Sequence, residues 1–419
     1  MTTLGAVEAV FRIESARIIA GVARIVRDVG IAEEIAQDAL VAALEQWPES
    51  GVPDNPGAWL MATAKHRAID LVRRKENYAR KLVEVGRTLE DVPPPEVSGP
   101  GDIDDDLLRL IFTACHPVLS TDARIALTLR LLGGLTTEEI ARAFLTADAT
   151  VAQRIVRAKR SLAKAGVAFE VPYGPDRSAR LDSVLEVIYL IFNEGYSATT
   201  GDDWTRPALC EDALRLARVL AALMPQEPEV HGLVALVEIQ ASRIAARVGP
   251  DGEPVLLADQ IRTRWDQLLI HRGFSALSRA NAVGDVPGPY TLQAAIAACH
   301  ARAVRYEDTD WRTVATLYGQ LAALVPSPVV ELNRAVAVAM ADGPTPALAL
   351  VDALVSEPAL KEYHLLPSVR GDLLARLERF GEAREEFARA AALTRNEKER
   401  ELLLGRARAA GVAASDRGA

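Results

Sequence analysis

Two stretches decide the fold of this chain: Ala58–Arg74 (AWLMATAKHRAIDLVRR) and Thr136–Leu162 (TTEEIARAFLTADATVAQRIVRAKRSL). In each, apolar residues recur at the three- and four-residue spacing of a helix, and Lys and Arg fill the positions between them. Such a helix packs its apolar stripe on its own domain and presents a basic face to solvent. The two stretches therefore predict helices whose exposed faces suit nucleic acid.

The composition predicts an all-α protein. The chain has 419 residues, which is too many for one hydrophobic core and enough for two to four domains. Hydrophobic residues make up 49% and aromatic residues only 5%, and Ala, Leu, Arg and Glu are frequent. These are helix-forming residues, and no convincing run of alternating β-branched residues predicts a strand.

The distribution of charge matters more than its total. The net charge of −9 argues against a nucleic-acid partner. However, residues 65–81 hold seven Lys and Arg against two acidic residues, and residues 142–164 hold six against one. Contact with phosphates depends on local charge, so both segments remain candidates for binding DNA or RNA.

Several function classes find no support in the sequence. The three cysteines are far apart and odd in number, which favours a reduced, cytoplasmic setting. No run of about 18 uncharged apolar residues predicts a membrane span. The histidines lack metal-ligand spacing, and no glycine-rich phosphate loop or nucleophile elbow is present. We therefore expect no metal, no cofactor and no enzymatic activity.

Breaks in the helical pattern divide the chain into four parts. A helical domain is expected over residues 1–88, with helices near Ile31–Trp47 and over Ala58–Arg74 and a loop over Pro48–Gly57 between them. A linker rich in Pro, Gly and Asp follows over 89–105, and we expect it to be extended by its own charge. A second helical domain is predicted over 106–168, and a C-terminal helical domain over 180–412.

The second domain has the pattern of a helix-turn-helix. Thr136 with Glu139 three residues later forms a capping box at the start of one helix. A short turn at Leu145–Ala147 separates that helix from a basic helix over Asp148–Lys164.

In this order the segments resemble a known family. The strings are Ala32–Trp47 (AEEIAQDALVAALEQW), Asn55–Arg74 (NPGAWLMATAKHRAIDLVRR) and Val151–Leu162 (VAQRIVRAKRSL). Together they resemble the extracytoplasmic-function (ECF) group of bacterial RNA polymerase sigma factors over roughly residues 1–166. The remainder resembles the subgroup with a C-terminal tetratricopeptide-like extension, through Asn193–Trp204 (NEGYSATTGDDW) and Ala258–Asp266 (ADQIRTRWD), with Ile261 where we would expect an acidic residue.

The resemblance implies core RNA polymerase and promoter DNA as partners. The first domain, as sigma region 2, would bind polymerase and open the −10 element, and the helix-turn-helix, as region 4, would read the −35 element. On the first domain, Asn55 in the loop is a candidate base-edge donor, and His66 and Asp70 would line the base-contacting face. The −10 candidates are Asn55, Lys65, His66, Arg67, Asp70, Arg73 and Arg74. A solvated basic face, with Asp70 paired to a neighbouring arginine, is the alternative.

The helix near Ile31–Trp47 is acidic. Its negative charge repels DNA and suits a basic protein surface. By resemblance it meets the polymerase, and an ordinary exposed helix face is the alternative. The polymerase-binding candidates are Glu34, Gln37, Asp38 and Leu40, of which Gln37 and Asp38 are the strongest.

On the basic helix of the helix-turn-helix, base contacts concentrate near the start of the helix. Arg154 and Arg157 are the strongest candidates for reading bases, whereas Lys159 and Arg160 suit phosphates. The −35 candidates are Thr150, Gln153, Arg154, Arg157, Lys159 and Arg160. A surface helix with scattered charge is the alternative.

The C-terminal domain carries two unusual loops in which tryptophans stand among Asp and Arg. Their residues are Asp203, Trp204, Asp259, Arg262, Trp265 and Asp266. Such loops suit an interface with the sigma-like domains or with a regulatory protein partner. A salt-bridged loop inside the domain is an equal alternative.

These observations favour a transcription initiation factor whose C-terminal domain regulates or supports its activity. Two alternatives stay open. One is a helix-turn-helix regulator that binds DNA without polymerase, and the other is a tetratricopeptide-type scaffold that does not bind DNA.

Overall fold

The structure is a computed structural model that describes residues 3–84, 101–144, 146–197, 205–249, 253–394 and 396–418. Within these residues the chain is helical, with an isolated antiparallel bridge between Val248 and Pro254 and no strand. The all-α prediction is thereby confirmed. The chain divides into two compact units, residues 1–190 and 191–419, and we describe each by itself.

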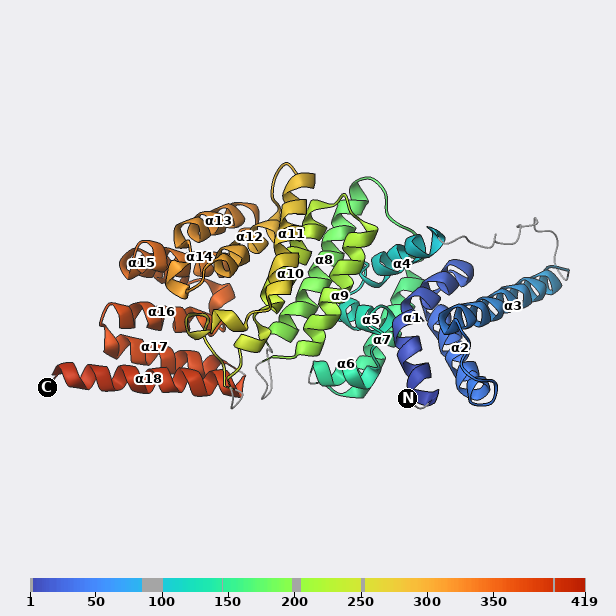
Figure 1. Cartoon of the computed structure of the whole chain (residues 1–419), viewed down its shortest axis with the longest axis horizontal. Helices are drawn as coiled ribbons and strands as arrows, with labels where there is room; N and C mark the ends of the chain where they lie inside the picture. The colour runs from blue at the N-terminus through green and yellow to red at the C-terminus, as the bar shows by residue number, and fades with distance from the viewer. Residues whose placement is uncertain are drawn as a thin grey trace. The chain divides into compact units, whose positions relative to one another are not determined.

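The first unit holds two groups of helices (Figure 1). The first group is a three-helix bundle, and the second contains the helix-turn-helix. The helices are α1 (Thr3–Val26), α2 (Val29–Ser50), α3 (Pro56–Glu84), α4 (Gly101–Ala114), α5 (Thr121–Leu131), α6 (Thr137–Ala143), α7 (Asp148–Lys164) and the first part of α8 (Pro175–Tyr196).

Local sequence sets the two corners of the bundle. Arg27 adopts a left-handed backbone with φ 54° after α1. Asp28 then caps α2 by accepting hydrogen bonds from the backbone N–H groups of Gly30 and Ile31, at 2.7 and 3.0 Å. At the other end α2 continues through Pro48 to Ser50 and stops at Gly51, whose φ is 81°. The loop before α3 is therefore shorter than the predicted Pro48–Gly57.

The bundle core is built from the apolar stripes that the sequence predicts. Ile18 of α1, Ala36 of α2 and Leu60 of α3 are fully buried. Trp47 is 1% exposed, and its ring meets that of Trp59 edge-on, with the centroids 5.4 Å apart. Burial of this stripe leaves the polar face of α3 outside the core.

The helix-turn-helix also follows the prediction. The capping box is present: Thr136 Oγ1 accepts from the Glu139 N–H at 3.1 Å, and Glu139 Oε2 accepts from the Thr136 N–H at 2.8 Å. In α7, one stripe of residues at helical spacing is buried: Val151, Ile155, Ala158 and Leu162. The opposite face of α7 is basic.

The predicted linker is shorter than expected. Most of it lies outside the described residues, but residues 101–105 already belong to α4. Asp106, the first residue of the predicted second domain, is 3% exposed. It pairs with Arg109 at 2.7 Å and with Arg24 of α1 at 3.2 Å. Two cations thus compensate the buried Asp106 carboxylate, which explains its place in a helix.

The first part of α8 packs on α4. Ser183 Oγ donates to the Cys115 carbonyl at 2.6 Å, and Arg180 Nη2 donates to the Phe112 carbonyl at 3.1 Å. Ser183 in turn accepts from the buried Arg124. Carbonyls at a helix C-terminus lack partners within the helix, and α8 supplies them here. Residues 180–190, predicted to open the C-terminal domain, therefore group with the first unit.

In the second unit, helices pack largely on their neighbours in chain order, as in helical repeat proteins. The helices are α9 (Pro207–Leu223), α10 (Pro228–Ala241), α11 (Gln267–Val283), α12 (Pro289–Arg302), α13 (Trp311–Leu324), α14 (Pro328–Ala341), α15 (Pro344–Leu354), α16 (Leu365–Arg376), α17 (Phe380–Leu393) and α18 (Glu397–Gly418). Short 3₁₀ turns are η1 (Ile244–Ala246), η2 (Leu257–Asp259), η3 (Arg262–Arg264), η4 (Tyr306–Asp308) and η5 (Pro358–Leu360).

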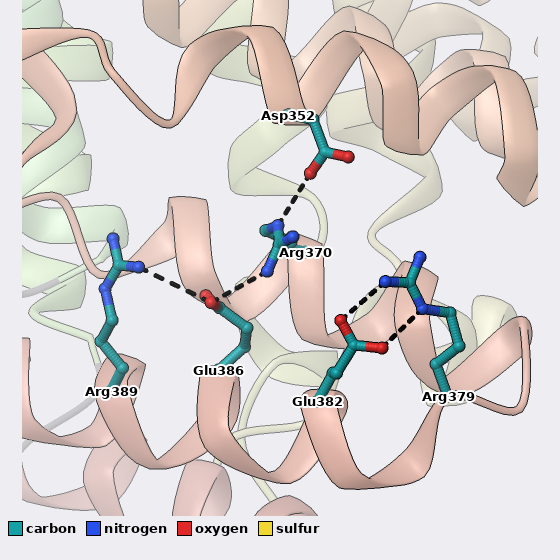
Figure 2. A network of polar contacts seen from close by, with 6 residues as sticks. All are labelled: Asp352, Arg370, Arg379, Glu382, Glu386 and Arg389. Atoms are coloured by element: carbon teal, nitrogen blue, oxygen red, sulfur yellow. Dashed lines mark hydrogen bonds and ion pairs between the residues drawn. The ribbon is translucent and has the colours of Figure 1, made fainter.

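Ion pairs join neighbouring helices near the C-terminus (Figure 2). Arg370 of α16 donates to Asp352 of α15 at 2.8 Å and to Glu386 of α17 at 3.0 Å. Arg379 forms a bidentate pair with Glu382, at 2.7 and 2.6 Å. One guanidinium thus connects three successive helices through charge-assisted hydrogen bonds.

We predict that Ser183→Ala destabilises the first unit. The change leaves the Cys115 carbonyl and one N–H of Arg124 without a partner in a buried place, at a cost of about 1–3 kcal/mol. Urea unfolding followed by circular dichroism measures this as a lower midpoint. Ser275→Ala is the matched control, because Ser275 is exposed and bonds only its own helix, to the His271 carbonyl. Equal midpoints for the two variants would contradict the contact between α8 and α4.

Candidate nucleic-acid and polymerase interface

The basic face of α3 is open to solvent. The side chains of Arg73 and Arg74 are exposed, as are those of His66 and Asp70, and Lys65 is half-buried. Among the described residues, Asp70, Arg73 and Arg74 form no ion pair, so the alternative of an Asp70–arginine pair is not observed. A polyanion can therefore approach the end of α3 without first displacing an internal partner.

Two candidates on this face have structural partners. Arg67 lies 3.5 Å from Asp38 of α2, and both side chains are largely exposed. Such a pair is weak in water. Asn55 caps α3 by accepting from the Ala58 N–H at 3.0 Å. Its side-chain carbonyl is therefore used by the helix, whereas its amide nitrogen keeps the donor role that we assigned to it.

On the helix-turn-helix, the start of α7 lines a groove of about 400 Å³ against the residues that begin α5. Thr150, Gln153 and Arg157 are exposed along it. Arg154 also lines the groove, and its guanidinium pairs with Asp122 of α5 at 3.0 Å. Arg160 is exposed outside this lining. Apart from Lys159, the side chains predicted to meet DNA thus share the polar face of one helix.

Lys159 differs from the expectation of a free phosphate-binding cation. Its ammonium forms an ion pair with Glu33 of α2. Glu33 is 5% exposed and also accepts from Arg130 Nε of α5 at 2.6 Å. Gln37 Nε2 donates to the same carboxylate at 3.1 Å. We call Glu33, Arg130 and Lys159 the Glu33 triad; it joins the three-helix bundle to the helix-turn-helix.

The acidic helix α2 therefore has two kinds of acidic residue. Glu34 and Asp38 are exposed, and Leu40 is half-buried. Glu33 contacts Arg130 of α5 and Lys159 of α7 through the triad, and Gln37 donates to Glu33. The sequence placed Gln37 among the strongest polymerase contacts, but in this structure its amide is engaged with Glu33.

The loops of the second unit are only partly described. Asp203 and Trp204 lie outside the described residues. Asp266 caps α11 by accepting from the backbone N–H groups of Leu268 and Leu269, at 2.9 and 3.1 Å, and Asp259 is exposed.

The remaining loop candidates point inward. Trp265 is 3% exposed, and the Arg262 guanidinium stacks on its ring with the centroid at 4.4 Å. Neither Asp259 nor Asp266 pairs with Arg262 within the described chain. Trp265 is thus internal while Asp259 and Asp266 are exposed, and Arg262 makes a cation–π contact with Trp265 in place of a salt bridge to either carboxylate.

The structure adds residues that the sequence analysis did not select. Arg130 completes the Glu33 triad, although its sequence position on α5 gives no sign of it. In the second unit, the Arg243 guanidinium stacks on the same ring as Arg262, that of Trp265, at 5.0 Å from the ring centroid. A possible signal was the pair Arg243 and Arg247, four residues apart in an otherwise apolar stretch.

The described residues offer little other chemistry. They contain no group of three or more His, Cys, Asp or Glu placed to hold a metal ion. No helix among them is both long and apolar enough to cross a bilayer. The three cysteines are buried and free, and burial raises the pKa of Cys115 to about 11 and that of Cys210 to about 12. These thiols are therefore protonated and poorly reactive near neutral pH.

Both groups of helices in the first unit match known protein families. Sigma-70 region 2 matches residues 11–78, and sigma-70 region 4 matches residues 109–162. ECF RNA polymerase sigma factor SigK of Mycobacterium ulcerans is 30% identical over 145 residues, which cover 34% of this chain and 75% of that protein. The chain belongs to the ECF sigma factors.

This sigma factor carries a long C-terminal extension, and residues 180–281 match a family of unknown function, DUF6596. An uncharacterised protein of Rhizobium meliloti (strain 1021) is 44% identical over 381 residues, covering 90% of this chain and 89% of that protein. A tetratricopeptide repeat protein from Parabacteroides merdae aligns with 65% of this chain at a TM-score of 0.35 and 14% identity, which is too distant to support an argument.

We predict that Glu33→Gln loosens the packing of the helix-turn-helix on α2. The amide keeps the size of Glu33 but leaves Arg130 and Lys159 without their carboxylate, at a cost of about 2 kcal/mol. Hydrogen exchange of the α7 amides should become faster, and the urea midpoint should fall. The neighbouring Glu34→Gln is the matched control, since Glu34 is exposed and forms no ion pair in the described chain. Unchanged protection of α7 in Glu33→Gln would argue against the triad.

Proposed function

We propose that this sigma factor binds core RNA polymerase through α2, opens promoter DNA with α3 and contacts the upstream promoter element with α7. The polymerase supplies the catalysis. The observation that carries the proposal is that the chain matches both sigma regions and leaves the basic faces of α3 and α7 exposed. Promoter-specific transcripts from core polymerase and a library of genomic fragments, dependent on this chain, test it.

The division of charge between neighbouring helices supports this assignment. On α2, Glu34 and Asp38 give an acidic surface, which repels DNA and attracts a basic protein. On α3, Arg73 and Arg74 give a basic surface suited to a displaced strand. Because the two helices belong to one bundle, a polymerase bound to α2 would hold α3 close to the DNA it opens.

On α7, the first turns suit base contacts and the later turns suit phosphates. Thr150, Gln153 and Arg157 line an open groove. Arg154 can exchange its exposed partner Asp122 for a base at small cost, because surface ion pairs are weak.

The Glu33 triad adds a condition to DNA binding. Lys159 contacts a phosphate only after it has left Glu33, and Glu33 then needs water or another cation. We therefore propose that polymerase or promoter binding separates the helix-turn-helix from α2, with the triad favouring the closed arrangement of the free protein.

We also propose that the C-terminal unit regulates or supports initiation. Its helices pack in chain order, and such proteins provide extended surfaces for protein partners.

We expect Glu34→Lys to weaken the binding of core polymerase. Glu34 has no recorded partner within the described residues, so reversal of its charge leaves the fold intact and changes only the surface of α2. Co-purification with core polymerase should fall about tenfold, since a misplaced charge at an interface costs more than 1 kcal/mol. Glu362→Lys, an exposed reversal in the second unit, is the control.

A regulator that acts without polymerase predicts a different result. Glu34→Lys would then leave activity unchanged, and the chain would bind its operator alone with full affinity.

We expect Arg157→Ala to reduce promoter-specific binding by the polymerase holoenzyme. Loss of a base contact costs about 1–3 kcal/mol and relaxes specificity at one position. Arg160→Ala, a phosphate-type change, should lower binding evenly across promoter variants and reduce the salt dependence. Filter binding with a set of upstream-element variants measures both. If neither change affects binding, α7 does not contact DNA.

A further inference from the structure

In the second unit, three basic side chains gather in one place. Arg243 precedes η1, Arg262 begins η3, and His300 lies near the end of α12. The guanidiniums of Arg243 and Arg262 both stack on Trp265, at 5.0 and 4.4 Å from its ring. Arg262 also donates to the His300 backbone carbonyl. We call these three residues the Arg243 cluster.

The Arg243 cluster is withdrawn from water. Arg243 is 8% exposed and Trp265 is 3% exposed, and Arg262 and His300 are half-buried. The His300 ring packs edge-on against Trp311, with the centroids 5.1 Å apart. Burial and the two guanidiniums lower the pKa of His300 to about 4, so this histidine is neutral near pH 7.

Other arginines of this unit pair with carboxylates. Arg218 grips the buried Glu238 at 2.8 and 3.0 Å, and Arg370 joins Asp352 and Glu386 (Figure 2). The side chain of Arg243, by contrast, donates hydrogen bonds to the amide oxygens of Gln240 and Gln260, both at 3.2 Å. Within the described chain no acidic side chain pairs with Arg243 or Arg262. Two like charges thus lie together without a paired carboxylate, although Glu307 lies near enough to favour the charged form of Arg262.

Several polar atoms in the cluster also lack partners. Arg262 Nε and Nη2 are buried and donate to no acceptor, and His300 Nδ1 has no hydrogen-bond partner. The Trp265 indole N–H is likewise unpaired. Buried donors without acceptors are costly, most of all on a cation. An acceptor with negative charge would satisfy both the charge and the donors.

We propose that the Arg243 cluster binds a small oxyanion, the phosphate or carboxylate group of a small metabolite. A guanidinium offers parallel donors that match such a group. A small ligand is indicated because Arg243 and Trp265 lie too deep for a folded partner surface. The binding site stands whether or not the chain initiates transcription, and it would give the C-terminal unit a ligand through which to act.

Thermal unfolding of the full chain tests the proposal with phosphate, citrate and chloride at equal ionic strength. We expect a saturable rise in melting temperature with phosphate or citrate and not with chloride, since a ligand that binds only the folded state stabilises it. The more effective anion identifies the group, phosphate or carboxylate. An equal response to all three salts would overturn the proposal.

Two variants from the same turn localise the site. Arg262→Gln should raise the half-saturating anion concentration roughly tenfold or more, since it removes charge-assisted donors. Arg264→Gln removes the same charge from an exposed position two residues away and should leave that concentration unchanged. Equal responses of the two variants would place the anion elsewhere and refute the site. If Arg262→Gln does not fold, Arg262→Lys takes its place in the test. Lysine keeps the positive charge but lacks the parallel N–H donors of the guanidinium.

The pKa of His300, measured by NMR in the folded protein, is a third test. The chain has six histidines, so ring resonances of ¹⁵N-labelled protein can be resolved, and His300→Gln assigns the signal. A bound anion should raise the pKa of His300 from about 4 towards its ordinary value, because it offsets the two guanidiniums. A His300 signal unchanged by saturating phosphate and by citrate would overturn the proposal.

Discussion

A charge withdrawn from water must be compensated, and this constraint organises both units of the protein. In the first unit, the buried carboxylate of Glu33 takes Arg130 and Lys159, and that of Asp106 takes Arg24 and Arg109. Glu33 takes both partners from helices that are distant in sequence, whereas Asp106 takes Arg24 from α1 and Arg109 from its own helix α4. These pairings fix how the three-helix bundle and the helix-turn-helix contact each other, and hydrophobic stripes alone carry no such specificity.

The same constraint connects fold to function in the sigma regions. Lys159 is a predicted phosphate contact, but it lies apart from the face that the other candidates of α7 share and neutralises a carboxylate on α2. One charge thus serves either the closed protein or the nucleic acid. Arg73 and Arg74 of α3 are exposed and form no ion pair with described residues. In our proposal, DNA binding by Lys159 is therefore tied energetically to the packing of the helix-turn-helix on α2.

In the second unit some arginines pair with a carboxylate, whereas Arg243 and Arg262 do not. Arg218 pairs with Glu238. Arg370 pairs with Asp352 and Glu386 and so joins successive helices. Arg243 and Arg262 have aromatic rings and amide oxygens instead. Cation–π contacts offset part of the cost of burying a guanidinium, but they supply no opposite charge. The exception therefore marks a place prepared for an anion.

The sequence by itself determined the local features. Helical periodicity gave the stripes of α3 and α7, the Thr136–Glu139 pair set the start of α6, and the order of motifs identified the family. These features depend on residues close together in the chain, so a local pattern contains them. It misjudged Pro48, which a helix tolerates in its last turn here, and residues 101–105, whose charge suggested a linker.

Only the tertiary structure decided which charges meet. Glu33, Arg130 and Lys159 come from three separate helices, and Arg243, Arg262 and His300 come from three separate segments. Periodicity shows that a residue faces inward or outward, but it does not show what lies opposite. For an ionised group the neighbour across the interface sets the energy, and that neighbour is fixed only when the helices have packed.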